Sequence, residues 1–262
     1  MRSFKILIVL LVAITTVVVT ALVLTITRGE QRPTTPTSVP SSPPANRPSS
    51  APAGASSADL FGNRLEIPAD ESGVPAVQVP DARPDPARPD YLVTPPAQMR
   101  WQRGWGGAAL PVSASDGPAT IRDGIASGFA RTPQGAALAA ADALARALAA
   151  PEGTWQRAVV ERYYHGEQAV VDRFARSRAR TPDAARFVVV PDGVRIVPGY
   201  SPDFAVVEFA ARDGLGYRIA RWPMTWFDGD WRVAVPADIE ALWGPGTYID
   251  SLSGFGAWRT VA

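Results

Sequence analysis

The stretch that decides the fold is FAVVEFAARDGLGYRIARWPMTWFDGDWRVAV, residues 204–235. Asp-Gly pairs at 213–214 and 228–229 interrupt it, and such pairs suit tight hairpin turns because glycine, and to a lesser extent aspartate, tolerates a positive φ. The stretch therefore predicts an antiparallel meander. Its expected strands are residues 204–211, 216–226 and 231–235, and Asp192-Gly193 predicts a further hairpin between residues 186–190 and 194–197.

Helical patterns precede the strands. Thr132-Pro133 is a typical helix start, with threonine as N-cap and proline at the first helical position, and Pro151 ends the helix near residue 150. Its alanines predict a buried side that approaches a sheet closely, whereas Asp142 and Arg146 predict an outward ion pair. Residues 154–164 and 167–180 are the next expected helices. Helices followed by a meander predict an α+β domain.

Residues 6–26, ILIVLLVAITTVVVTALVLTI, contain no charge, proline or glycine. At about 1.5 Å per residue such a helix spans the roughly 30 Å core of a bilayer. We expect an uncleaved anchor with its N-terminus in the cytoplasm and the rest of the chain outside it. The alternative, a cleaved signal peptide, has a shorter apolar run and a small-x-small cleavage site.

The chain divides into four expected segments by composition. Residues 1–30 are a cytoplasmic stub and transmembrane anchor, 31–58 a disordered Pro/Ser/Thr linker, 59–100 an extended Pro-rich strap, and 101–262 the globular α+β domain. The strap carries isolated large apolar residues that we expect to anchor it to the domain. They are Leu60, Phe61, Leu65, Ile67, Val74, Val77, Val79, Tyr91 and Leu92.

Composition excludes several kinds of chemistry. The chain has no cysteine, so it has neither disulfides nor a thiolate nucleophile, and its net charge of +1 gives no reason to expect direct nucleic-acid binding. His165 is the sole histidine and no G-x-S-x-G motif occurs, so we expect no catalytic residue, cofactor or metal site. An acid–base enzyme would have to use Tyr163, Tyr164, His165 or Asp172.

Two groups of residues are candidates for interaction. Arg173, Arg176 and Arg180 share one helix face, which would bind an acidic partner, lipid headgroups or a wall polymer, or simply be solvated. Four tryptophans in Gly-rich loops are expected to be exposed and available to a partner. They are Trp101, Trp105, Trp243 and Trp258.

Two resemblances add to this reading. Residues 227–233, FDGDWRV, after a helical region, resemble the nuclear-transport-factor-2-like superfamily, which implies a cone-like sheet around helices. The runs DLFGNR (59–64), LPVSASDGP (110–118) and GFARTPQGAA (128–137) resemble an uncharacterised actinobacterial family of membrane-anchored proteins that often occur with conjugation genes. This second resemblance covers about residues 59–262.

Similar anchor-linker-cone layouts occur in bitopic scaffold subunits of type IV secretion systems. The resemblance therefore implies a scaffold with envelope proteins, or further copies of itself, as partners. The alternatives are a small-molecule-binding or isomerase/dehydratase-type cone and a cell-envelope-binding module that uses the tryptophan loops. A polar cavity containing His165 or Asp172 would favour the enzyme, and a filled interior the scaffold.

Overall fold

The computed structural model describes residues 56–259. The predicted anchor at residues 6–26 and nearly all of the expected linker lie outside this range. Within residues 56–259, no helix combines the length and the apolar composition that a membrane crossing needs.

The three predicted helices are all present. Helix α2 runs over Pro133–Ala149, α3 over Thr154–Arg162 and α4 over Glu167–Arg180. The N-cap of α2 has the expected chemistry, since the Thr132 side chain accepts a hydrogen bond from Gly135 N at 2.9 Å. The helices pack on sheets, so the α+β class is confirmed.

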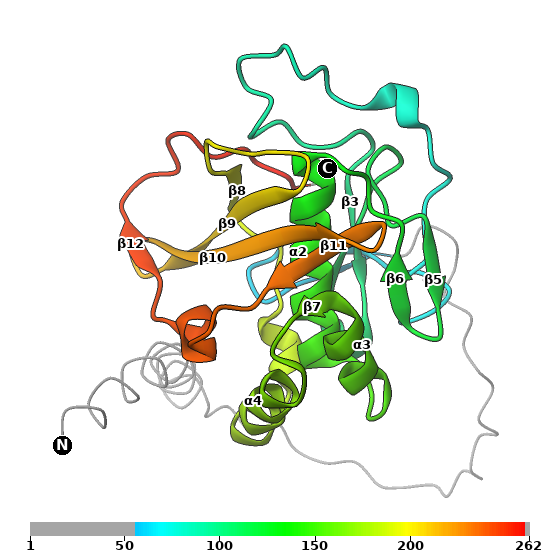
Figure 1. Cartoon of the computed structure of the whole chain (residues 1–262), viewed down its shortest axis with the longest axis vertical. Coiled ribbons are helices and arrows are strands. Elements are labelled where there is room, and N and C mark those ends of the chain that lie inside the picture. Colours follow the sequence, from blue (N-terminus) through cyan, green and yellow to red (C-terminus); the bar gives the residue numbers. More distant parts are fainter. Residues whose placement is uncertain (1–55, 260–262) are drawn as a thin grey trace, which may run out of the picture. The chain divides into compact units, whose positions relative to one another are not determined.

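A six-stranded sheet contains the predicted meander. Its order is β7-β11-β10-β9-β8, with β12 pairing β10; β7 is parallel to β11 and the other pairs are antiparallel. Figure 1 shows β10 and β11 crossing in front of α2, which packs against one face of this sheet. The strands are β7 (Tyr163–Tyr164), β8 (Gly193–Ile196), β9 (Phe204–Asp213), β10 (Gly216–Phe227), β11 (Asp230–Ala234) and β12 (Thr247–Ile249).

Two of the three predicted Asp-Gly hairpins form. Gly214 has φ +63° in the β9–β10 turn, and Asp228 and Gly229 have φ +53° and +78° in the β10–β11 turn. Positive φ at both central residues is what a type I′ turn requires. The third prediction is wrong: residues Ala184–Phe187 form a 3₁₀ helix, η3, and Asp192 instead accepts hydrogen bonds from Arg212.

Helix α2 lies between two layers, because it contacts β8 to β11 on one side and β4 (Ala109–Val112) on the other. Its alanines let both layers approach closely. The predicted outward pair is therefore wrong: Asp142 and Arg146 are 0% and 1% exposed and bond to each other inside the fold. A helix covered on both sides has no outward face for them.

A four-stranded sheet crosses the expected boundary at residue 101. Its order is β1-β2-β3-β4, formed by β1 (Ser56–Ala58), β2 (Arg64–Glu66), β3 (Arg100–Arg103) and β4. The last residues of the expected linker and the start of the strap are thus paired with the domain. A separate hairpin joins β5 (Thr120–Arg122) to β6 (Ile125–Ser127), and short 3₁₀ turns are η1 (Pro80–Ala82), η2 (Trp105–Gly107) and η4 (Ile239–Trp243).

Both apolar anchors and hydrogen bonds hold the strap. Leu65 is fully buried and Leu92 packs against the main core, whereas Val77 is 86% exposed and Leu60, Ile67, Val74 and Val79 are also exposed. The two remaining anchors, Phe61 and Tyr91, are half-buried. The further contacts are polar: Gln102 bonds the backbone of Val74, and Gln134 donates to the carbonyls of Tyr91 and Thr94. Prolines and turns leave strap backbone groups without strand partners, and these side chains supply them.

Candidate functional site

The residues considered for acid–base chemistry do not converge on a cavity. His165 is exposed, has φ +56° and stacks on Tyr164 with 4.1 Å between ring centroids. Asp172 is exposed on α4 and accepts a hydrogen bond from Gln168 at 2.7 Å. The two side chains therefore meet solvent, not an enclosed substrate site.

Tyr163 points the other way, into the core. It is 4% exposed, contacts the Phe174 ring edge-on at 5.3 Å, and its hydroxyl has no hydrogen-bond partner within the described residues. Burial raises the pKa of this hydroxyl, so it stays protonated at neutral pH.

The predicted arginine face is divided by the structure. Arg173 is 9% exposed, and its Nε lies 2.8 Å from Glu240 Oε1. Arg176 is half-exposed, with Nη2 3.8 Å from the same oxygen, and Arg180 is exposed. Of the three arginines, only Arg176 and Arg180 are therefore accessible to a partner. Glu240 already neutralises part of the positive charge of Arg173 and Arg176.

One predicted tryptophan belongs to the same cluster. The guanidinium of Arg173 lies 4.6 Å from the Trp243 ring centroid, and Trp243 in turn contacts Phe174 edge-on at 5.0 Å. Arg173 and Trp243, which the sequence analysis treats as separate candidates, therefore contact each other and hold η4 against α4.

The prediction that Trp101 and Trp258 are exposed is wrong, since each is 2% exposed. Trp101 Nε1 donates to Trp258 O at 2.7 Å, and Trp258 Nε1 donates to Val93 O at 2.9 Å. A Cβ at Gly256 would lie only 1.8 Å from Val93 O. Glycine here permits close packing of the loop and does not indicate exposure. Trp105 is half-buried, with the Arg146 guanidinium 5.7 Å from its ring.

A buried polar network centred on Asp116 was missed by the sequence reasoning. Asp116 is fully buried; its Oδ2 accepts a hydrogen bond from Ser115 Oγ and its Oδ1 accepts one from Thr132 Oγ1, both at 2.5 Å. Ser113 Oγ lies 3.3 Å from Ser115 Oγ. We call Ser113, Ser115, Asp116 and Thr132 the Asp116 network.

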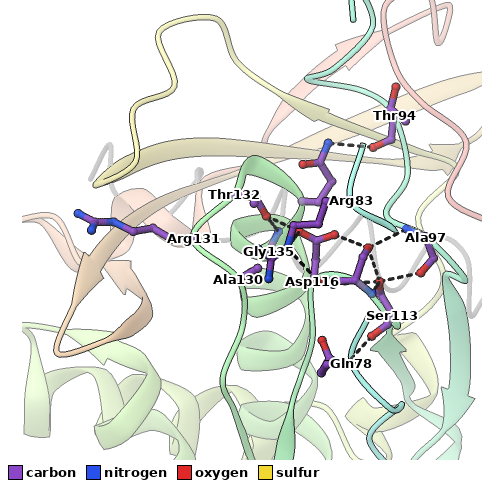
Figure 2. Close-up of polar contacts among 12 residues, drawn as sticks. Gln78, Arg83, Thr94, Ala97, Ser113, Asp116, Ala130, Arg131, Thr132 and Gly135 are labelled. Carbon is purple, nitrogen blue, oxygen red and sulfur yellow. Dashed lines mark hydrogen bonds and ion pairs between the residues drawn. The ribbon is translucent and has the colours of Figure 1, made fainter. Parts of the chain in front are cut away.

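The Asp116 network connects the strap to the start of α2. Figure 2 shows the contacts running from Ala97 of the strap through Ser113 and Asp116 to Thr132 and Gly135. Ala97 N donates to Ser115 Oγ at 2.9 Å, and Arg83 Nε donates to Ser115 O at 3.0 Å. Because the helix N-cap and the strap share one carboxylate, moving the strap disturbs the cap.

The chemistry of the Asp116 network is that of a structural contact. Ser115 donates its proton to a carboxylate and has no histidine beside it, so it lacks the base that activates a serine nucleophile. Within residues 56–259, no group of three His, Cys, Asp or Glu side chains is arranged to hold a metal ion. The sequence signal for the network is the run LPVSASDGP, residues 110–118, which places two serines and an aspartate within four residues.

The sequence model of one family matches residues 66–257, and its description is a domain of unknown function, DUF8175. This match covers most of the chain. The chain belongs to the DUF8175 family. The DUF8175 match begins at the end of β2, so the strap from residue 66 onward and the Asp116 network lie inside the family's domain. No curated protein and no solved structure matches the chain.

Proposed function

We propose that this DUF8175 protein is a membrane-anchored, extracytoplasmic scaffold with a cone-like domain, working in a conjugation or type IV secretion-like machine. Residues 6–26 are the anchor, residues 31–55 the linker, and the domain presents surfaces to envelope proteins or to further copies of itself. The setting rests on the resemblance of residues 59–262 to a family found with conjugation genes. Helices α2 and α3 contact the sheet ordered β7-β11-β10-β9-β8, and Val170 and Phe174 of α4 join the same apolar cluster, which supports the cone-like description.

The observation that carries the scaffold proposal is the filled interior of the sheet. The inward side chains of β8 to β11 are at most 5% exposed and pack in one cluster with the alanines of α2 and with Val170 and Phe174 of α4. No room is left there for a substrate of ordinary size. These inward residues are Val194, Ile196, Ala205, Val207, Trp222, Met224, Trp231 and Val233.

One observation favours the rival, a cone that binds a small molecule. The Tyr163 hydroxyl and the Trp222 indole N–H are both buried without a hydrogen-bond partner within the described residues. Unpaired buried polar groups are uncommon, and at functional sites they bind ligands. The apolar packing argues against this, because both residues belong to the main hydrophobic cluster.

The two functions are distinguished by variants in a strain that lacks the gene, with conjugative transfer frequency as the measurement. His165→Ala with Asp172→Ala should leave transfer unchanged. Arg176→Glu with Arg180→Glu should lower it at unchanged melting temperature, because a like-charged interface costs several kcal/mol. Arg173 is left intact, since it is bound to Glu240 inside the fold.

Arg64→Glu with Arg122→Glu is the matched control, because both side chains are exposed and lie on other elements. This variant should transfer normally. Loss of transfer from His165→Ala, with harmless charge reversal on α4, would reject the scaffold proposal and favour the enzyme.

A further inference from the structure

The six-stranded sheet has a second face that turns away from α2, which we call the outer face. Along β9, Ala205 and Val207 point into the core, so Phe204, Val206 and Glu208 lie on the outer face by strand alternation. Exposure on the outer face is uneven, since Phe204 and the Arg221 side chain are exposed whereas Glu208 is only 1% exposed. A partner can therefore reach this face at Arg221 and Phe204.

A charged row crosses the outer face. Glu208 on β9 is the direct cross-strand neighbour of Arg195 on β8 and of Arg221 on β10. Glu208 Oε2 lies 2.9 Å from Arg195 Nε, and Glu208 Oε1 lies 2.9 Å from Arg221 Nε. One carboxylate faces two guanidiniums, so the row keeps an uncompensated positive charge.

The two arginines of this row keep Glu208 ionised. Burial alone would raise the pKa of Glu208, but hydrogen bonds from Arg221 and Arg195 outweigh burial and hold it below its ordinary value. Each arginine uses its Nε and Nη2 atoms on Glu208, which leaves the Nη1 edge for other acceptors. Arg195 is further fixed by the Phe255 ring, 4.2 Å away, and the Arg221 side chain is 67% exposed.

An apolar row lies beside the charged one. Val206 is paired with Pro223, and one step further Phe204 is paired with Thr225. Phe204 is 43% exposed, and Val206 and Pro223 are half-buried. Successive rows on one face are two residues apart, roughly 6.6 Å. Arginines alone would fit any polyanion, but a partner must also carry apolar groups at this spacing to cover the second row.

We propose that the outer face binds an extended protein segment in which an acidic side chain is followed two residues later by an apolar one. The acidic group takes the Nη1 edges of Arg195 and Arg221, and the apolar side chain covers Val206, Pro223 and Phe204. The orientation of both arginines is already set by Glu208, so little side-chain entropy is lost on binding. This inference deepens the proposed scaffold function by naming the chemistry of its partner.

The test uses the full chain in zwitterionic lipid nanodiscs and the fluorescence anisotropy of a labelled peptide with the repeat Glu-Ser-Leu-Ser. The peptide should bind, and binding should weaken with added salt. Peptides with the repeats Lys-Ser-Leu-Ser and Glu-Ser-Ser-Ser should bind at least about tenfold more weakly. Polyphosphate should compete poorly. This experiment measures peptide binding and not transfer frequency, so a failure of the peptide to bind would leave the scaffold proposal standing.

Phe204→Ser with Arg221→Ser should weaken peptide binding about tenfold. The matched control, Leu215→Ser with Arg122→Ser, removes an exposed apolar side chain and an exposed arginine elsewhere and should bind normally. If the Phe204→Ser with Arg221→Ser variant has a lowered melting temperature, the single variant Phe204→Ser is measured in its place. It should weaken peptide binding about threefold. The proposal is overturned by no peptide binding, by equal binding of polyphosphate or the acid-only peptide, or by equal losses in both variant pairs.

Discussion

Asp142 and Arg146, one turn apart on α2, form an ion pair from which solvent is excluded. Arg146 Nε lies 2.8 Å from Asp142 Oδ2, and its Nη2 donates to Ser72 O at 3.1 Å. Its Nη1 donates to Gly124 O in the β5–β6 turn. The pair therefore ties the strap and a hairpin to the central helix.

Asp142→Ala should destabilise the fold by about 3–5 kcal/mol, because it leaves a buried guanidinium without its counter-charge. Urea unfolding followed by tryptophan fluorescence measures this loss. Asp142→Leu with Arg146→Met should recover part of it, since no charge is then buried. The exposed Arg88–Asp90 pair is the control: Asp90→Ala should leave the urea midpoint unchanged. Equal shifts for Asp142→Ala and Asp90→Ala would mean that Asp142 is not buried.

Asp116→Ala should loosen the attachment of the strap to the domain while the six-stranded sheet stays folded. The buried hydroxyl of Ser115 and the half-buried hydroxyl of Thr132 lose their acceptor, at a cost of about 1–3 kcal/mol each. Hydrogen exchange should quicken at the amides of Val79 and Ala97 and stay slow in β9 and β10. Asp70→Ala is the control, because Asp70 caps only the local amide of Ser72. Unchanged protection at Ala97 would contradict the role of Asp116.

Gly214→Val and Gly229→Val should each destabilise the fold by about 1–2 kcal/mol, since a side chain at positive φ is strained. No atom outside the local chain lies within 4 Å of the added Cβ at either position, so the effect is backbone strain and not a clash. Gly244 has φ −59° and room for a Cβ, so Gly244→Val should be close to neutral. Thermal melting compares the three variants, and equal melting temperatures would show that the turns tolerate valine.

Stability should fall in acid through Glu208. Its pKa is lowered in the folded state, so the unfolded chain binds the proton more readily and stability decreases as the pH falls through the folded pKa. We expect a flat urea midpoint between about pH 5 and 8 and a decline below about pH 4. Glu208→Gln should lower the midpoint at neutral pH and make the acid decline shallower. Glu161→Gln, an exposed change on α3, should alter neither; an unchanged acid decline in Glu208→Gln would exclude Glu208 as its source.

Protease added to intact protoplasts should remove the domain and leave the anchor in the membrane. The reason is the uncharged run at residues 6–26, followed by a chain with no comparable helix between residues 56 and 259. Immunoblotting against the C-terminal end measures the loss, and a cytoplasmic enzyme is the control for lysis. Complete protection of the domain would contradict the proposed orientation.

Local chemistry was enough to predict the helices and the meander. Thr132-Pro133 specifies a helix start through its own side chain and fixed φ. Gly214 in one turn, and Asp228 with Gly229 in the other, supply the positive φ values that the two hairpins need. These signals act within a few residues, so they can be recognised in the sequence without knowing which segments pack nearby. The hairpin predicted at Asp192-Gly193 does not form. Asp192 instead accepts a hydrogen bond from Arg212, and its Oδ1 lies 3.6 Å from Arg259 Nη1.

The sequence by itself determined which segments are helical, where the two tight turns lie and that the class is α+β. Tertiary structure decided which faces are buried, because burial depends on layers contributed by distant segments. The sequence places the Asp142–Arg146 pair on an outward helix face, but β4 and the strap cover it. It also favours an exposed Trp258, but the loop packs closely because Gly256 lies against Val93 O. The same holds for the rows of the outer face: Arg195, Glu208 and Arg221 are up to 26 residues apart in sequence and become neighbours only through strand register.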